Sequence, residues 1–88
     1  MKLIFAIVRD TDSDPVSKTL TGSGFRVTTI ASTGGFWRRG QSTLLIGVED
    51  EKLDEAMSLI RNSVTKPSES DTQNTTIFVV NINQFYQF

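Results

Sequence analysis

The chain alternates short apolar segments of the strand type with segments of the helix type, and their order leaves few possible folds. Runs rich in Ile, Val and Phe predict strands at four places, 1–8, 25–32, 42–49 and 75–82. The first helix is expected to begin at Pro15 with Asp14 as its N-cap, and to end at Gly22 and Gly24. A second helix is indicated by apolar residues at intervals of three and four: Leu53, Ala56, Met57, Ile60 and Val64.

This order is β-α-β-β-α-β, which predicts an α+β, ferredoxin-like fold with a four-stranded antiparallel sheet. Both helices would cover one face and leave the other open. Alternation assigns to the helix side Phe25, Val27, Leu44, Ile46 and Val48, and to the open side Arg26, Thr28, Ile30, Thr43, Leu45 and Gly47. The first and last strands are apolar on both sides, which a sheet with one buried face does not require. Another copy of the chain is therefore expected to cover the open face.

The length, charge and composition of the chain exclude several classes of function. The 88 residues predict a single domain, 1–88. Nine basic against ten acidic residues argue against binding to a nucleic acid polymer. The absence of cysteine and histidine excludes thiolate and imidazole catalysis and the usual transition-metal sites. The apolar start, 3–8, is too short to enter a membrane as a span, so a cytoplasmic protein is expected.

The connection between the two middle strands is unusual for a hairpin, which commonly needs two to five residues. It carries three glycines, two large aromatic residues and two arginines: Gly34, Gly35, Gly40, Phe36, Trp37, Arg38 and Arg39. Glycine lets the backbone approach a ligand, an aromatic ring stacks on a base, and arginine binds phosphate. The loop thus indicates a nucleotide pocket, although the glycines could form a wide turn and the arginines a solvated tip.

Three stretches, MKLIFAIVRDTDSD, FRVTTIASTGGFWRRGQSTLLIGVEDEKLDE and TIFVVNINQFYQF, cover most of the chain and carry a family resemblance. The chain resembles the PII-like cyclic-di-AMP receptors, bacterial signal-transduction proteins. The resemblance implies a homotrimer that binds cyclic di-AMP in clefts between neighbouring subunits. It also implies that the ligand changes loop conformation and so signals to a downstream protein, which the sequence does not identify.

The resemblance implies ligand-binding roles for eight residues: Arg26, Thr28, Gly35, Phe36, Trp37, Gln41, Gly47 and Phe78. It implies no cofactor besides the ligand and no metal. From the residues alone, Arg26 could instead pair with a carboxylate across an interface, since an unpaired charge on an apolar face is costly. Gly47 weakens an apolar strand unless something approaches its backbone closely.

The chain departs from the family where it has Gly24 and Gln41 in place of asparagine, and Trp37 in place of leucine. Its segment 62–74 is also shorter than the corresponding loop of the family. These departures leave an alternative open. The same trimer could bind another nucleotide, such as ATP or ADP, or no ligand, and act as a protein-interaction module.

An enzyme is not expected. Acylphosphatases share the layout but carry an arginine in a phosphate-binding loop after the first strand. The corresponding stretch here, RDTDSDP, is acidic. Its carboxylates, Asp10, Asp12 and Asp14, could suggest a divalent cation, but capping and solvation of the first helix explain them more simply. RNA binding is disfavoured by the charge and by the few aromatic residues on the central strands.

Overall fold

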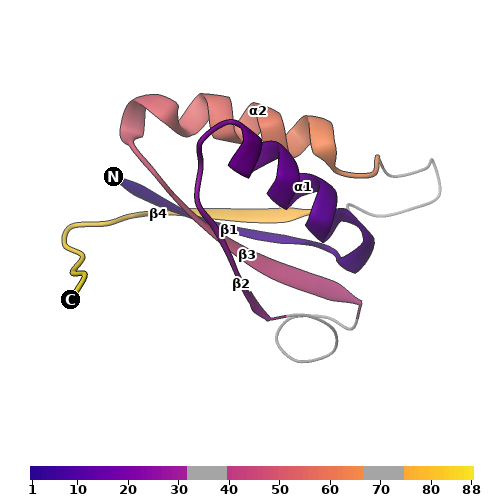
Figure 1. Cartoon of the computed structure of the whole chain (residues 1–88), viewed down its shortest axis with the longest axis horizontal. Helices are drawn as coiled ribbons and strands as arrows, with labels where there is room; N and C mark the ends of the chain where they lie inside the picture. The colour runs from indigo at the N-terminus through magenta and orange to yellow at the C-terminus, as the bar shows by residue number, and fades with distance from the viewer. Residues whose placement is uncertain (32–39, 67–74) are drawn as a thin grey trace.

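The computed structural model describes residues 1–31, 40–66 and 75–88, and their element order confirms the predicted β-α-β-β-α-β arrangement (Figure 1). In chain order the elements are β1 (Lys2–Arg9), α1 (Asp10–Gly22), β2 (Val27–Ala31), β3 (Gln41–Val48), the 3₁₀ turn η1 (Asp50–Lys52), α2 (Leu53–Ser63) and β4 (Thr76–Asn81). The fold is α+β and ferredoxin-like, as expected.

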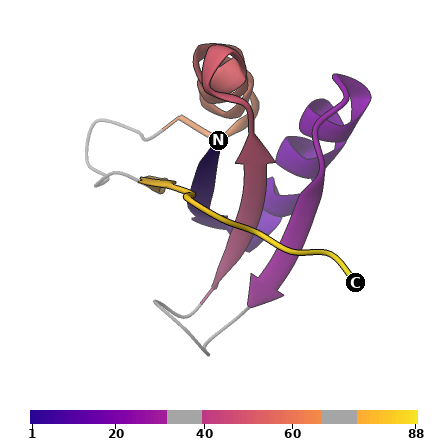
Figure 2. The ribbon, with the colours of Figure 1, turned by 90° about the vertical axis from the view of Figure 1, so that its left-hand side faces the viewer.

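The strands form an antiparallel sheet in the order β2-β3-β1-β4. Both helices lie on the same side of it, as Figures 1 and 2 show from two directions. Thus β1 and β3 are central, while β2 and β4 are the edges. The register places Phe5 opposite Leu45 on β3 and opposite Phe78 on β4. Because residues directly opposite each other point to the same face, these three side chains form a row across the sheet.

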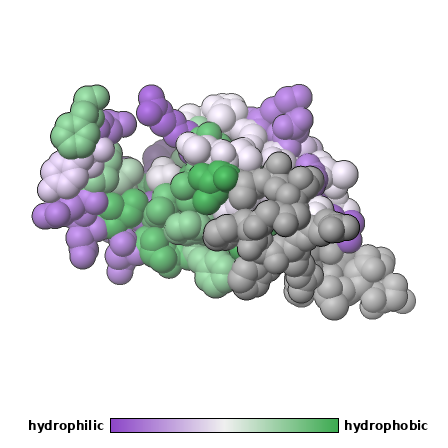
Figure 3. All heavy atoms as spheres, turned by 90° about the horizontal axis from the view of Figure 1, so that it is seen from below, coloured by the Kyte–Doolittle hydropathy of each residue, from purple (hydrophilic) through white to green (hydrophobic). Residues whose placement is uncertain are grey.

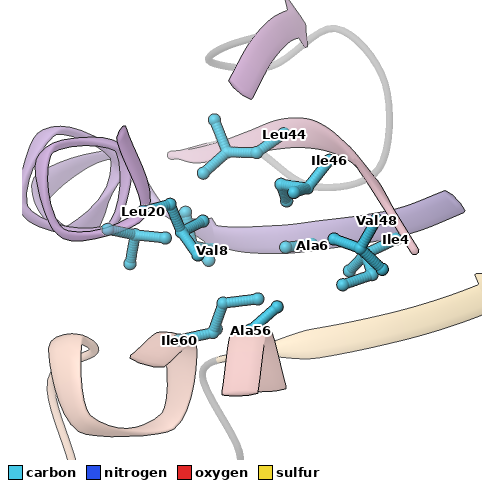
Figure 4. Close-up of a cluster of buried hydrophobic side chains, with 10 residues drawn as sticks. Ile4, Ala6, Val8, Leu20, Leu44, Ile46, Val48, Ala56 and Ile60 are labelled. Atoms are coloured by element: carbon cyan, nitrogen blue, oxygen red, sulfur yellow. The ribbon is translucent and has the colours of Figure 1, made fainter. Parts of the chain in front are cut away.

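The core lies between the sheet and the helices (Figure 4). Its buried members are Ile4, Ala6, Val8, Val16, Leu20, Leu44, Ile46, Val48, Ala56 and Ile60. In this core, alternate residues of β1 and β3 pack against residues four apart on each helix, Val16 and Leu20 on α1 and Ala56 and Ile60 on α2. This follows because side chains return to the same face every second residue in a strand and every three to four residues in a helix. The residues assigned to the helix side of β3 are therefore confirmed as core. Phe25 and Val27 pack against the same cluster.

The face opposite the helices carries an apolar patch (Figure 3). Phe78 is 48% exposed there, and Val80 is 42% exposed. Leu45 and Phe5 are half-buried in the middle of the sheet, while Thr43 and Ile7 are already buried within the single chain. The described part of the chain thus leaves apolar surface on this face without a covering element.

The predicted start of the first helix is wrong. The helix α1 begins at Asp10, and Pro15 lies inside it instead of at its first position. Proline has no N–H, so it cannot make the helical bond to the carbonyl of Thr11. The first turn forms nevertheless because Asp10 and Asp12 are hydrogen-bonded to distant parts of the chain. Both carboxylates also interact favourably with the positive end of the helix dipole.

Candidate functional site

A surface pocket of about 340 Å³ lies at the end of the sheet where β2 begins and β3 ends. Its lining comes from the connection between α1 and β2, the end of β3, the turn η1 and the first residue: Met1, Ser23, Gly24, Phe25, Arg26, Gly47, Val48, Glu49 and Lys52. The volume falls in the range of ligand pockets, roughly 300–1,000 Å³. Two of the expected binding residues, Arg26 and Gly47, belong to this lining.

Arg26 and Gly47 are neighbours across two strands. Val27 pairs with Ile46, and continuing that antiparallel register sets Arg26 opposite Gly47. Arg26 points away from the core because Phe25 and Val27, on either side, pack against it. Thr28, the third expected residue, is exposed on the same face one alternation further along β2. These three residues therefore form one group.

Gly47 lines the pocket with its backbone alone, because glycine has no side chain. A Cβ atom built on Gly47 would lie 3.3 Å from the terminal Cε of Met1, a tight but adjustable contact. The sequence analysis expected something to approach the backbone of Gly47 closely, and the side chain of Met1 does so on one side. The remaining side of Gly47 faces the pocket that Arg26 also lines.

Gly24 gives the pocket its shape at the end of α1. Its φ angle is +93°, and its N–H donates to the carbonyl of Thr21 at 3.1 Å. Few residues other than glycine adopt such a φ angle. No atom lies within 4 Å of a Cβ built at this position, so a side chain there would project into open space at the pocket.

The charges around the pocket leave Arg26 available to an anion. The ammonium group of Met1 lies 3.0 Å from Asp50 Oδ1 and, by hydrogen bonding to it, holds the pKa of that carboxyl below its usual range. Lys52 lies 3.6 Å from Glu55 in an exposed pair. Among the residues that the structure describes, Arg26 forms no ion pair, so the alternative of a carboxylate across an interface and that of a ligand both stay open.

Two other expected residues, Gln41 and Phe78, lie away from this group. Gln41 begins β3, and six residues of extended strand place it about 20 Å from Gly47. Gly35, Phe36 and Trp37 precede it in a segment outside the described residues. Phe78 shares a row with Thr28, but the two stand on opposite edge strands, three strand spacings or about 14 Å apart. The structure therefore unites Arg26, Thr28 and Gly47, and separates them from Gln41 and Phe78.

Lys52 and Ser23 also line the pocket, and the sequence analysis did not identify them. Lys52 is brought there by η1, in which its N–H donates to the carbonyl of Glu49 at 2.9 Å. The sequence offered a signal in the acidic start of the second helix, 49–54, which contains this single lysine. The sequence of this acidic stretch does not show whether the lysine side chain faces the pocket or solvent.

Two carboxylates of the acidic stretch, Asp10 and Asp12, have a different role from the one expected. Asp10 accepts a hydrogen bond from Ser42 Oγ at 2.5 Å, and Asp12 is buried and accepts bonds from Thr65. The prediction of capping and solvation is therefore wrong for Asp10 and Asp12, which make long-range contacts, whereas Asp14 is exposed. Among the described residues, no group of acidic side chains has the arrangement of a metal site. No helix in the described ranges is long and apolar enough to cross a membrane.

Two comparisons with known proteins bear on this site. A family model described as "Cyclic-di-AMP receptor" matches residues 1–70, which include every expected binding residue except Phe78. A crystal structure of a functionally unknown protein from Pediococcus pentosaceus ATCC 25745 matches with a TM-score of 0.81 and 30% sequence identity. That match covers 99% of this chain and 96% of the other.

Proposed function

The chain belongs to the cyclic-di-AMP receptor family, and from this we propose that it is a cytoplasmic sensor that binds cyclic di-AMP between the subunits of a homotrimer. Ligand binding would change the conformation of loops read by a downstream protein. The chain is a binding protein and not an enzyme in this proposal. The observation that supports it best is Arg26, a cation without an ion pair in the described chain, lining a pocket beside Gly47.

The separation of the expected residues supports a site made by two chains. Arg26 and Gly47 lie at one end of β2 and β3, whereas Gln41 lies at the other end, about 20 Å away. One chain alone cannot bring both ends to one base. In the proposed trimer, a neighbouring subunit places the start of its β3, with Gln41, beside this pocket. Each ligand would then contact Arg26 of one subunit and the loop with Phe36 and Trp37 of the next.

The apolar face supports the trimer. Half-buried Leu45 and Phe5 and exposed Phe78 form a continuous row on the face opposite the helices. Covering such a row removes apolar surface from water, at about 25 cal/mol per Å². In the proposed trimer, this row packs against neighbouring copies, and the pocket beside it becomes a cleft.

A second candidate function keeps the trimer and changes the ligand to ATP, ADP or none. Gly24 favours it, because the wall of the pocket lacks the side chain that the family resemblance implies there. The two candidates differ in ligand preference and can be separated by titration.

Isothermal titration of the purified protein with cyclic di-AMP, cyclic di-GMP, ATP and ADP tests the proposal. We expect saturable binding of cyclic di-AMP with one ligand per chain and weaker binding of the other three. Tighter binding of ATP or ADP would favour the second candidate. No heat and no thermal stabilisation with any of the four ligands would contradict nucleotide binding altogether.

Phe36 is proposed to stack on an adenine, a role that rests on the family resemblance because Phe36 lies outside the described residues. Base stacking on an aromatic side chain contributes about 1–3 kcal/mol. Phe36→Ala should therefore raise the Kd for cyclic di-AMP roughly five- to 150-fold. Tyr86→Ala, which truncates an exposed aromatic residue of the C-terminal tail, serves as the comparison. An unchanged Kd in a Phe36→Ala protein of unaltered mass would rule out stacking.

Gly24→Asn should tighten cyclic-di-AMP binding several-fold. The pocket has room for the side chain, and a new hydrogen bond to the ligand contributes about 0.5–1.5 kcal/mol. The backbone opposes the change, since φ is +93° and asparagine tolerates positive φ better than most residues but less well than glycine. Gly24→Ala is the matched control, because alanine also has to adopt the positive φ angle but brings no side-chain amide that could bind the ligand. Weaker binding by Gly24→Asn than by Gly24→Ala would mean that the pocket serves another ligand.

A further inference from the structure

The first turn of α1 is hydrogen-bonded to two segments that are far apart in the sequence. On one side, the Asp10 N–H donates to the carbonyl of Gly40 at 2.9 Å, and Ser42 Oγ donates to Asp10 Oδ1 at 2.5 Å. On the other side, Asp12 accepts from the N–H and the hydroxyl of Thr65, at 3.1 and 2.7 Å. The turn therefore holds both the start of β3 and the chain that leaves α2.

The positions of Asp10 and Asp12 allow the first turn of α1 to link the start of β3 to the chain that follows α2. Residues two apart on a helix point about 200° apart, so Asp10 and Asp12 face nearly opposite sides of the same turn. One partner of each contact is buried, since Ser42 and Asp12 are each only 3% exposed, whereas Asp10 is half-buried and Thr65 is exposed. Hydrogen bonds to a buried carboxylate are strong, and losing one leaves a costly unpaired charge.

Pro15 loosens this turn from the rest of α1. It cannot donate to the carbonyl of Thr11, so the helix lacks one of the bonds that would tie its first turn to its second. A helix bends most readily where such a bond is missing. The first turn can therefore shift relative to the remainder of α1 while Val16 and Leu20 stay fixed in the core.

We propose that the first turn of α1 couples the start of β3 to Thr65, so that a change at one of them alters the other. The start of β3 includes Gln41, an expected ligand contact, and Thr65 lies in the connection between α2 and β4. Through this coupling, cyclic di-AMP at the proposed site changes the backbone at Thr65, 53 residues from Asp12 in sequence. This second step rests on the proposed function, whereas the coupling itself does not.

The coupling is tested without ligand, by amide hydrogen exchange in the full-length protein. Ser42→Ala removes one bond to Asp10 and is expected to speed exchange at the Thr65 amide about three- to tenfold, the effect of one lost hydrogen bond. Thr21→Ala removes a hydroxyl bond from the far end of the same helix and should leave Thr65 unchanged. Faster exchange at Asp10 with an unchanged Thr65 would overturn the coupling. An equal rise at buried Ile60 would also overturn it, because it would mean global loosening.

Ligand transmission is tested by repeating the exchange measurement with saturating cyclic di-AMP. We expect exchange at Thr65 to change at least threefold in the native protein, and this change to disappear in Asp12→Ala, which removes both acceptors of Thr65, while the Kd stays within about threefold. Thr65→Val, at an exposed position, is the second variant should Asp12→Ala fail to fold. Binding without any response at Thr65 would refute the transmission. Failure to bind would contradict the proposed function, and the exchange test without ligand would still decide the coupling.

Discussion

Leu45→Asp is expected to dissociate the proposed homotrimer into folded monomers. Leu45 lies near the middle of the open face, opposite Phe5 on one side and Thr28 on the other. In the single chain its side chain is only half-buried, so an aspartate there can remain hydrated. In the assembly the same carboxylate would be buried among apolar side chains without a partner, which costs several kcal/mol at each interface.

Light scattering measures the result, which should be a fall from the mass of three chains to that of one. Circular dichroism establishes that the monomer is folded. Ser58→Asp adds the same charge on the exposed side of α2 and should leave the mass unchanged. A Leu45→Asp protein that keeps its assembled mass would show that the subunits associate through another surface, and a native protein of monomer mass would exclude the trimer.

The order of the elements was predictable because the strands are short apolar runs and the apolar residues of β3 and α2 each follow the period of their element. Leu44, Ile46 and Val48 recur at every second position, and all three are core residues on the helix side of β3. Ala56 and Ile60 are spaced for one side of a helix and are buried in α2. Burial of these side chains is decided by local spacing, which a single sequence contains.

The start of α1 was not predictable, because it depends on contacts that local rules cannot include. Capping preferences favoured Asp14 before Pro15, which would be correct for an isolated helix. The structure instead extends the helix to Asp10, where Ser42 and Thr65 supply hydrogen bonds from 32 and 53 residues away. The same contacts explain why Asp12 is buried instead of solvated.

The candidate site was predictable in part. Alternation placed Arg26 and Thr28 on one face, and the register then set Gly47 beside Arg26. The separation of Gln41 from this group follows from strand length, and that of Phe78 from strand order. Residue spacing cannot reveal that order, because β4 could have joined either edge of the sheet. Lys52 was missed because its place depends on the turn η1.

Arg26→Ala is expected to raise the Kd for cyclic di-AMP about ten- to 150-fold. A hydrogen bond between a guanidinium and a phosphate is charge-assisted, and such bonds contribute roughly 1.5–3 kcal/mol. Arg26 is suited to this contact because it lines the pocket and has no ion pair within the described ranges. The fold should tolerate the change, since the side chain is exposed. Arg61→Ala, which removes an exposed arginine from the last turn of α2, is the matched control.

Arg26→Lys separates charge from geometry at the same position. Lysine retains the positive charge but lacks the planar fork that grips two phosphate oxygens at once. If Arg26 binds phosphate through both arms, the lysine variant should recover only a small part of the affinity lost in Arg26→Ala. Recovery to the native Kd would mean that charge alone is needed. Native affinity in Arg26→Ala itself would remove Arg26 from the site, because a cation lining the pocket would then make no contact with the ligand.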